Sequence, residues 1–86
     1  MSNRARKLLR RAIESPGAIR FKELEFLATA FGFEYCRGRG SHHIYKCVGV
    51  TELLNLQNVN GIAKAYQVRQ LLALVERYNL QLGENR

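Results

Sequence analysis

The chain has 86 residues, 47% of them hydrophobic, and its 14 Lys and Arg residues against 7 Glu and no Asp give a formal net charge of +7. This length predicts one domain (1–86), and the apolar content excludes a disordered basic tail. A membrane-spanning helix is excluded because no apolar run approaches about 20 residues, and the lack of Asp excludes an Asp dyad or an Asp-built metal site. The basic charge favours a polyanionic partner, most commonly a nucleic acid.

The first predicted helix spans residues 3–14. Its apolar residues recur at i, i+3, i+4, i+7 and i+8, which places them on one face of a helix, and Ser15-Pro16-Gly17 ends it. The opposite face carries five basic residues, which by default keep a small protein soluble. These residues are Arg4, Arg6, Lys7, Arg10 and Arg11.

Two further helices are predicted by the same periodicity, over residues 21–31 and 63–78. Gly32 stands where a left-handed residue ends the first of them, and Asn79 stands at the equivalent position after the second. We expect the apolar stripe of each helix to pack on a sheet formed by the residues between them.

Three antiparallel strands are predicted between these helices, joined by short turns at Gly38-Arg39-Gly40 and Val48-Gly49. Asn58-Val59-Asn60-Gly61 ends the last of them. The order of elements predicts an α+β fold, in which helices cover one face of a three-stranded antiparallel sheet and the first helix is an N-terminal addition. The strands are expected over residues 33–37, 41–47 and 50–57.

The densest polar stretch of the chain runs from residue 37 to residue 46. Arg37 and Arg39 alternate with Gly38 and Gly40 at the predicted hairpin tip, where guanidinium groups and exposed backbone N–H groups would form a phosphate cradle. The two glycines are by themselves a weak signal, because glycine at a turn most often only supplies a positive φ angle.

Two adjacent histidines follow in the second predicted strand. Alternation places His43 and Tyr45 on one face of the sheet and His42, Ile44 and Lys46 on the other, so at most one histidine belongs to a given surface. An imidazole can take a proton from a ribose 2′-OH or give one to a leaving oxygen. The alternative is that both histidines are ordinary strand residues.

Two cysteines, Cys36 and Cys47, are too few for a disulfide framework, and the basic N-terminus lacks the apolar core of a signal peptide. We therefore expect reduced thiols and a cytoplasmic location. Together with His42 and His43 the cysteines have ligand types suited to zinc, but neighbouring strand residues point to opposite faces and no Cys-x-x-Cys pair is present. We expect no metal and no cofactor.

Two stretches resemble the HicA toxins of bacterial toxin–antitoxin pairs. The first is Phe33-Glu34 followed by Arg37-Gly38-Arg39-Gly40-Ser41-His42-His43 after a helix ending in Phe31-Gly32, and the second is the sequence of residues 61–70. The resemblance covers roughly residues 20–80. It implies a double-stranded-RNA-binding-like fold of helix, three strands and helix. It also implies a metal-independent endoribonuclease (an mRNA interferase) whose HicB antitoxin covers the active surface.

The resemblance also assigns roles to individual residues. His43, two residues after the motif serine, is implied to be the catalytic acid or base, and Gly40 and the adjacent Ser41 are expected to contact RNA. The second catalytic group stays open among Tyr45, Lys46 and an arginine. Charge and position further favour four phosphate contacts, at Arg37, Arg39, Lys46 and Lys64.

Within the single domain we expect a HicA-like core at residues 18–82, an N-terminal extension helix at 1–17 and a tail at 83–86. The expected partners are mRNA and a HicB-like antitoxin, with no membrane and no small-molecule cofactor. Two other hypotheses remain. One is a non-catalytic RNA-binding module, because a basic sheet with aromatic residues binds RNA without chemistry. The other is an interaction protein whose partner is an acidic chain.

Overall fold

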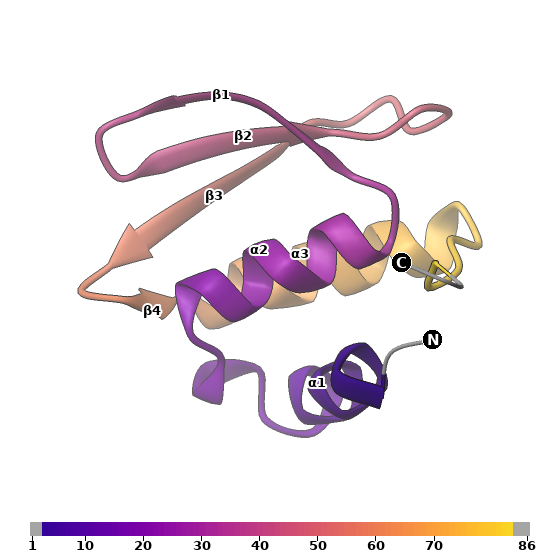
Figure 1. The fold of residues 1–86 in the computed structure, drawn as a ribbon, viewed down its shortest axis with the longest axis horizontal. Helices are drawn as coiled ribbons and strands as arrows, with labels where there is room; N and C mark the ends of the chain where they lie inside the picture. The colour runs from indigo at the N-terminus through magenta and orange to yellow at the C-terminus, as the bar shows by residue number, and fades with distance from the viewer. Residues whose placement is uncertain (1–2, 84–86) are drawn as a thin grey trace.

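An antiparallel sheet and three α-helices form an α+β fold, which the computed structural model describes for residues 3–83 (Figure 1). Residues 84–86 of the expected tail lie outside this range. None of the helices within residues 3–83 is long and apolar enough to cross a bilayer. The elements are α1 (Asn3–Glu14), a 3₁₀ turn η1 (Pro16–Ala18), α2 (Phe21–Ala30), β1 (Glu34–Arg39), β2 (His42–Lys46), β3 (Leu54–Val59), β4 (Ile62–Ala63) and α3 (Ala65–Arg77).

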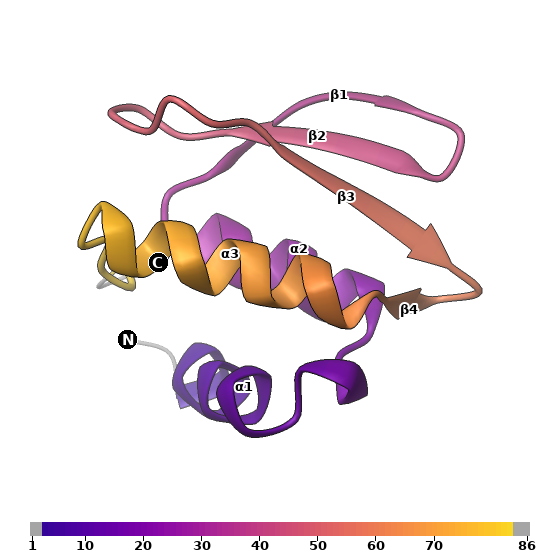
Figure 2. The same ribbon diagram turned by 180° about the vertical axis from the view of Figure 1, so that it is seen from behind.

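The molecule has three layers, in which α2 and α3 lie between the sheet and α1 (Figures 1 and 2). The apolar stripes of α2 and α3 meet β3 in the core, where Leu24, Leu56 and Leu71 have no exposed surface. Leu8 and Ala12 of α1 belong to the same cluster of buried side chains. The predicted N-terminal helix is therefore packed onto the rest of the described chain and has the predicted bounds.

Both predicted helix ends are confirmed. Gly32 has a φ of 101° and Asn79 a φ of 52°, so each residue occupies the left-handed region in which a helix ends. After Gly32, the backbone N–H of Phe33 donates to the carbonyl of Ala28 at 3.0 Å, which turns the chain back over α2. This reversal starts β1 directly above the helix that it follows.

The prediction of three strands is wrong, because a fourth strand pairs antiparallel with β3. Asn58 and Val59, predicted to end the sheet, belong to β3, and only Asn60-Gly61 forms the turn, both with positive φ. Ala63, predicted in the last helix, lies in β4 instead.

One predicted turn is displaced, and the connection at the other is longer than expected. Gly38 and Arg39 lie within β1, so the first hairpin turns at Gly40 and Ser41, one residue further along than expected. Val48-Gly49 does form a turn, in which the backbone N–H of Val50 donates to the carbonyl of Cys47 at 3.0 Å, but residues 47–53 make a longer loop between β2 and β3 than the expected hairpin. β3 begins at Leu54, beyond the expected residue 50, and its register is the one in which Leu54 and Leu56 are buried against the helices.

A β-bulge at Cys36 sets which residues of β1 share a face with β2. Tyr35 pairs with Tyr45, but Arg37 pairs with Ile44, so one extra residue stands in β1. The rows that face the helices are Tyr35–Tyr45–Leu54 and Gly38–His43–Leu56, and those on the open face are Arg37–Ile44–Asn55 and Arg39–His42–Gln57.

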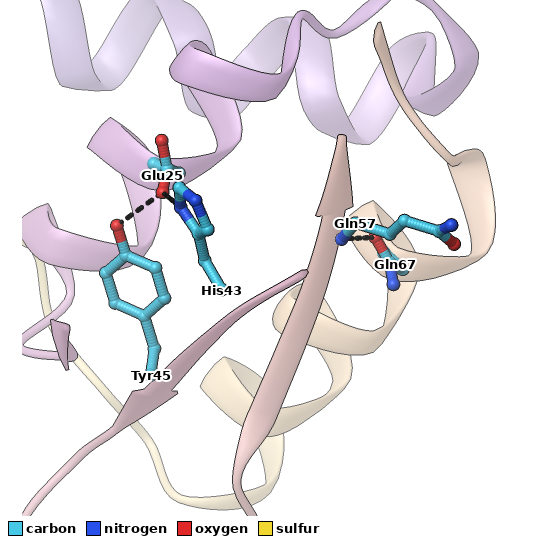
Figure 3. A network of polar contacts seen from close by, with 5 residues as sticks. All are labelled: Glu25, His43, Tyr45, Gln57 and Gln67. Atoms are coloured by element: carbon cyan, nitrogen blue, oxygen red, sulfur yellow. Dashed lines mark hydrogen bonds and ion pairs between the residues drawn. The ribbon is translucent and has the colours of Figure 1, made fainter. Parts of the chain in front are cut away.

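Gln67 of α3 completes the hydrogen bonding of β3 where β4 is too short to do so (Figure 3). Its side-chain carbonyl accepts the backbone N–H of Gln57 at 2.8 Å, and its amide donates to the backbone carbonyl of Asn55 at 2.7 Å. Gln67 is 4% exposed, and this pairing satisfies both ends of the buried amide.

Candidate active site

The candidate site centres on one carboxylate oxygen that holds two side chains of β2 (Figure 3). Nδ1 of His43 lies 2.5 Å from Oε2 of Glu25, and the hydroxyl of Tyr45 donates to the same oxygen at 2.8 Å. His43 and Tyr45 are two residues apart on one strand, so both point from the sheet toward α2, as alternation predicts. The sheet and the helix together fix this cluster.

Tyr45 stays protonated in this arrangement. Burial, followed by its hydrogen bond to Glu25 and the charge of that carboxylate, raises the pKa of Tyr45 well above its ordinary value of 10.0. With 6% of its surface exposed, Tyr45 supports the carboxylate from inside the core. Its role is therefore to position Glu25.

The contact with Glu25 determines which ring nitrogen of His43 is available to accept a proton. A carboxylate accepts a hydrogen bond, so Nδ1 carries the proton that is donated to Glu25, and Nε2 of the neutral ring keeps its lone pair. Nε2 has no hydrogen-bond partner within residues 3–83, and 32% of the His43 side chain is exposed. The imidazole can therefore accept a proton from a bound molecule.

Aromatic rings flank the imidazole on two sides. Phe21, at the start of α2, contacts the ring of His43 edge-on with centroids 5.1 Å apart, and Tyr35 of β1 does so at 5.4 Å. Phe21 is buried, whereas Tyr35 is 54% exposed. Tyr35 thus forms the solvent-facing wall of the site.

Gly38 lies opposite His43 and makes room for that wall. A methyl group on Gly38 would stand 2.3 Å from the hydroxyl oxygen of Tyr35 and 3.2 Å from Cδ2 of His43. The phenol of Tyr35 and the imidazole of His43 therefore approach the same point above a strand residue without a side chain. The two groups are near enough to contact one small substrate group.

The predicted phosphate-binding arginines lie on the other face of the sheet. Arg37 and Arg39 line a shallow pocket of about 520 Å³ together with Gly38, His42 and Ile44. A regular ladder continuing from the Tyr35–Tyr45 pair would place Arg37 opposite His43, and the bulge replaces it there with Gly38. The predicted site is therefore divided between two faces.

The remaining predicted residues are dispersed. Gly40 and Ser41 form the exposed hairpin turn, and Gly40 has a φ of 59°. Lys46 is exposed at the other end of β2, opposite Glu34 of β1. Lys64 precedes α3, and its ammonium lies 5.7 Å from the centroid of the Tyr66 ring. The structure brings none of these side chains into contact with His43.

Both cysteines carry free thiols, with Cys36 exposed in the bulge and Cys47 half-buried. Burial raises the pKa of Cys47, and the charge of Glu34 adds to the effect. Within residues 3–83, no three His, Cys, Asp or Glu side chains gather in a way that would hold a metal ion.

Sequence reasoning missed Glu25 and Tyr35. One signal for Glu25 was present, because it stands four residues after Phe21 and so lies beside the buried stripe of α2. A carboxylate at the edge of the core needs a hydrogen-bond donor, and His43 and Tyr45 of β2 are the donors here. Tyr35 gave no such signal, since its contact with His43 depends on the bulge that follows it.

Comparison with protein-family models, with curated proteins and with solved structures finds no match to this chain.

Proposed function

We propose that this protein is a metal-independent endoribonuclease, the toxin of a HicA-like toxin–antitoxin pair, with His43 as its general base. The observation that carries the proposal is the hydrogen bond between His43 and Glu25, which leaves Nε2 of a partly exposed side chain to accept a proton. The resemblance of residues 33–43 to HicA toxins and the net charge of +7 support RNA as the substrate.

The proposed reaction uses the 2′-hydroxyl of RNA as its nucleophile. Nε2 of His43 takes the hydroxyl proton while the 2′-oxygen attacks the adjacent phosphorus. The bond from phosphorus to the 5′-oxygen breaks, which leaves a 2′,3′-cyclic phosphate on one fragment and a 5′-oxygen on the other. Glu25 holds the imidazole in the correct tautomer and stabilises the imidazolium that forms.

The leaving 5′-oxygen needs a proton, and Tyr35 is the proposed donor. Its hydroxyl oxygen and Cδ2 of His43, the ring carbon next to Nε2, lie close to each other beside Gly38. A phosphodiester bound over these two side chains would have its nucleophile beside Nε2 of His43 and its leaving oxygen beside Tyr35. Of the groups that the sequence left open, Tyr45 is buried against Glu25, and Lys46 and the hairpin arginines face away from His43.

The order α2, β1, β2, β3, α3 fits the double-stranded-RNA-binding-like core that the resemblance implies, with β4 as an addition. In this proposal residues 18–82 are that core and residues 1–17 are its N-terminal extension. The protein acts in the cytoplasm. A HicB-like acidic antitoxin would inhibit the enzyme by covering His43, since a basic surface favours rapid association with an acidic partner.

A non-catalytic RNA-binding module remains the second candidate. It is favoured by the pocket at Arg37 and Arg39, which lies on the face opposite His43 and needs no contribution from that residue. In that case the RNA would lie on the open face of the sheet and stay intact.

Cleavage of end-labelled mRNA in EDTA distinguishes these functions. The wild type should cut internally, and His43→Ala should reduce the rate by at least 100-fold, as expected for loss of a general base. His42→Ala, on the opposite face, is the matched control and should keep most of the activity. Intact RNA with the wild type, or equal losses in the two variants, would contradict the proposal. Activity that chelation abolishes and metal restores would contradict its metal-independent form.

A further inference from the structure

A basic hollow lies between α1 and α2, on the side of α2 away from the sheet. It encloses about 350 Å³ and is lined by Arg4, Lys7, Leu8, Arg11 and Glu23. The three cations stand at i, i+3 and i+7, so they form one row along the α1 face next to α2. Residues 3–14 contain five basic residues and one acidic residue, so this helix supplies more than half of the net charge.

The hollow has an excess of positive charge that the described residues do not neutralise. Arg11 forms an ion pair with Glu23, whose carboxylate also accepts the backbone N–H of Arg20 at 2.9 Å. Arg4 lies over the ring of Phe26, with its guanidinium carbon 4.1 Å from the centroid. Within residues 3–83, neither Arg4 nor Lys7 is ion-paired with a carboxylate.

α2 connects this hollow to the candidate active site. Glu23 and Phe26 face α1, while Glu25 holds His43 on the sheet side, so only the width of one helix, about 10 Å, separates the two. Lys22 is exposed three residues before Glu25 and four before Phe26, so it adjoins both on the surface of α2. Lys22 therefore places one positive charge on the surface of α2 between the active site and the hollow.

We infer that RNA cut at His43 continues across α2 and places backbone phosphates in the hollow, where Arg4 and Lys7 bind them. This inference rests on the proposed ribonuclease function and extends it, because it gives the N-terminal helix a role in holding substrate. Phosphate recognition needs only correctly placed cations, so the contact is independent of base sequence.

A second hollow along α1 provides a control of matched charge. Arg6 and Arg10 line it with Leu9, Ile13 and Glu14, so the variants Arg4→Gln/Lys7→Gln and Arg6→Gln/Arg10→Gln remove equal charge from two separate hollows on one helix. RNA affinity is measured in the His43→Ala background, where the RNA stays intact, as a function of salt. Thermal unfolding of each variant confirms that the fold is retained.

The Arg4/Lys7 variant should bind a labelled single-stranded 12-nucleotide RNA about 25-fold more weakly at 0.1 M salt and lower the salt exponent by about 1.4, since each single-strand phosphate contact contributes about 0.7. The Arg6/Arg10 variant should stay within about twofold of its parent. With His43 present, kcat/KM for the long RNA should fall in the Arg4/Lys7 variant, whereas a dinucleotide, too short to reach the hollow, should be cut at the wild-type rate.

Equal losses in the two double variants, or none in either, would overturn the inference while wild-type cleavage leaves the ribonuclease function intact. If RNA binding is lost only in the Arg4/Lys7 variant, and neither the wild type nor a variant cleaves RNA, the result would support the phosphate site and refute the catalytic function. Equal slowing on the dinucleotide and the long RNA would also refute the inference, because it would place the defect at the active site.

Discussion

Replacing Gly38 by alanine tests the arrangement of Tyr35 and His43 without removing either side chain. The new methyl group would lie 2.3 Å from the Tyr35 hydroxyl oxygen, where ordinary contact begins at 3.4 Å, so that oxygen must move by about 1 Å. The imidazole carbon at 3.2 Å needs to yield only a few tenths of an ångström. The substitution therefore acts mainly on Tyr35.

The effect on stability should be small. Gly38 lies outside the left-handed region, so alanine brings no backbone strain, and replacing a strand glycine recovers about 0.5–1 kcal/mol of chain entropy. Overpacking costs about 1–3 kcal/mol in a closed core, but Tyr35 is half exposed and can swing outward. We expect a net loss of at most about 2 kcal/mol in the free energy of unfolding.

The effect on cleavage should be much larger. A catalytic group displaced by about 1 Å loses up to about 100-fold in rate, so kcat should fall by that order while KM changes little. Tyr35→Phe should show a similar loss, and adding Gly38→Ala to it should cost nothing further, since both act through one hydroxyl. Gly17→Ala, with no atom within 4 Å of the added carbon, is the control.

Single-turnover cleavage of labelled RNA measures these rates, and urea unfolding measures the stabilities. Full activity in Gly38→Ala, or multiplicative losses in the double variant, would refute the assignment of Tyr35 as proton donor.

Three further predictions concern side-chain contacts that stabilise the fold. Gln67→Leu should lower the free energy of unfolding by about 2–4 kcal/mol, because it leaves a backbone N–H and a carbonyl of β3 without partners. Gln70 is exposed on the same helix, so Gln70→Leu should change the free energy of unfolding by less than about 0.5 kcal/mol in the same urea titration. Tyr45→Phe should cost about 1.5 kcal/mol, since it removes a hydrogen bond to a carboxylate, and an unchanged urea midpoint would contradict that contact. Although burial alone would raise the pKa of Glu23, the Arg20 backbone and the Arg11 guanidinium lower it below 4.5, so Glu23 stabilises the fold above that pH and the stabilisation is lost as pH falls through the lowered value. Glu23→Gln should accordingly flatten the acid limb of a stability-against-pH curve, and an unaltered limb would exclude this contribution.

The helices follow from local sequence, whereas the sheet edge does not. The apolar periodicity of residues 3–14 and the left-handed stops at Gly32 and Asn79 are set by neighbouring residues, and the structure has all three. β4 has two residues and pairs with β3 and, at one bridge, with Arg20 before α2. Its existence depends on contacts between distant parts of the chain, which no local pattern records.

The part of the candidate site that depends on a local pattern was also predictable, and the rest was not. Alternation along β2 correctly places His43 and Tyr45 on one face, because that strand is regular. In β1 the extra residue at Cys36 exchanges the faces of every residue that follows it, so Arg37 moves away from His43 and Gly38 takes its place. A bulge has no reliable sequence signature, and one inserted residue is enough to divide a set of neighbours between two surfaces.

The amide of Gln67 has a consequence for how this sheet meets other molecules. It hydrogen-bonds the backbone carbonyl of Asn55 and the backbone N–H of Gln57, the groups with which another strand would pair along this side of β3. A strand from a neighbouring chain therefore cannot pair there. Within residues 3–83, β1 pairs with β2 and with no other strand, so its other side is the long edge at which strand addition remains open. Any growth of the sheet, whether by aggregation or by a bound peptide, is thereby directed to the margin that carries Tyr35 and Gly38.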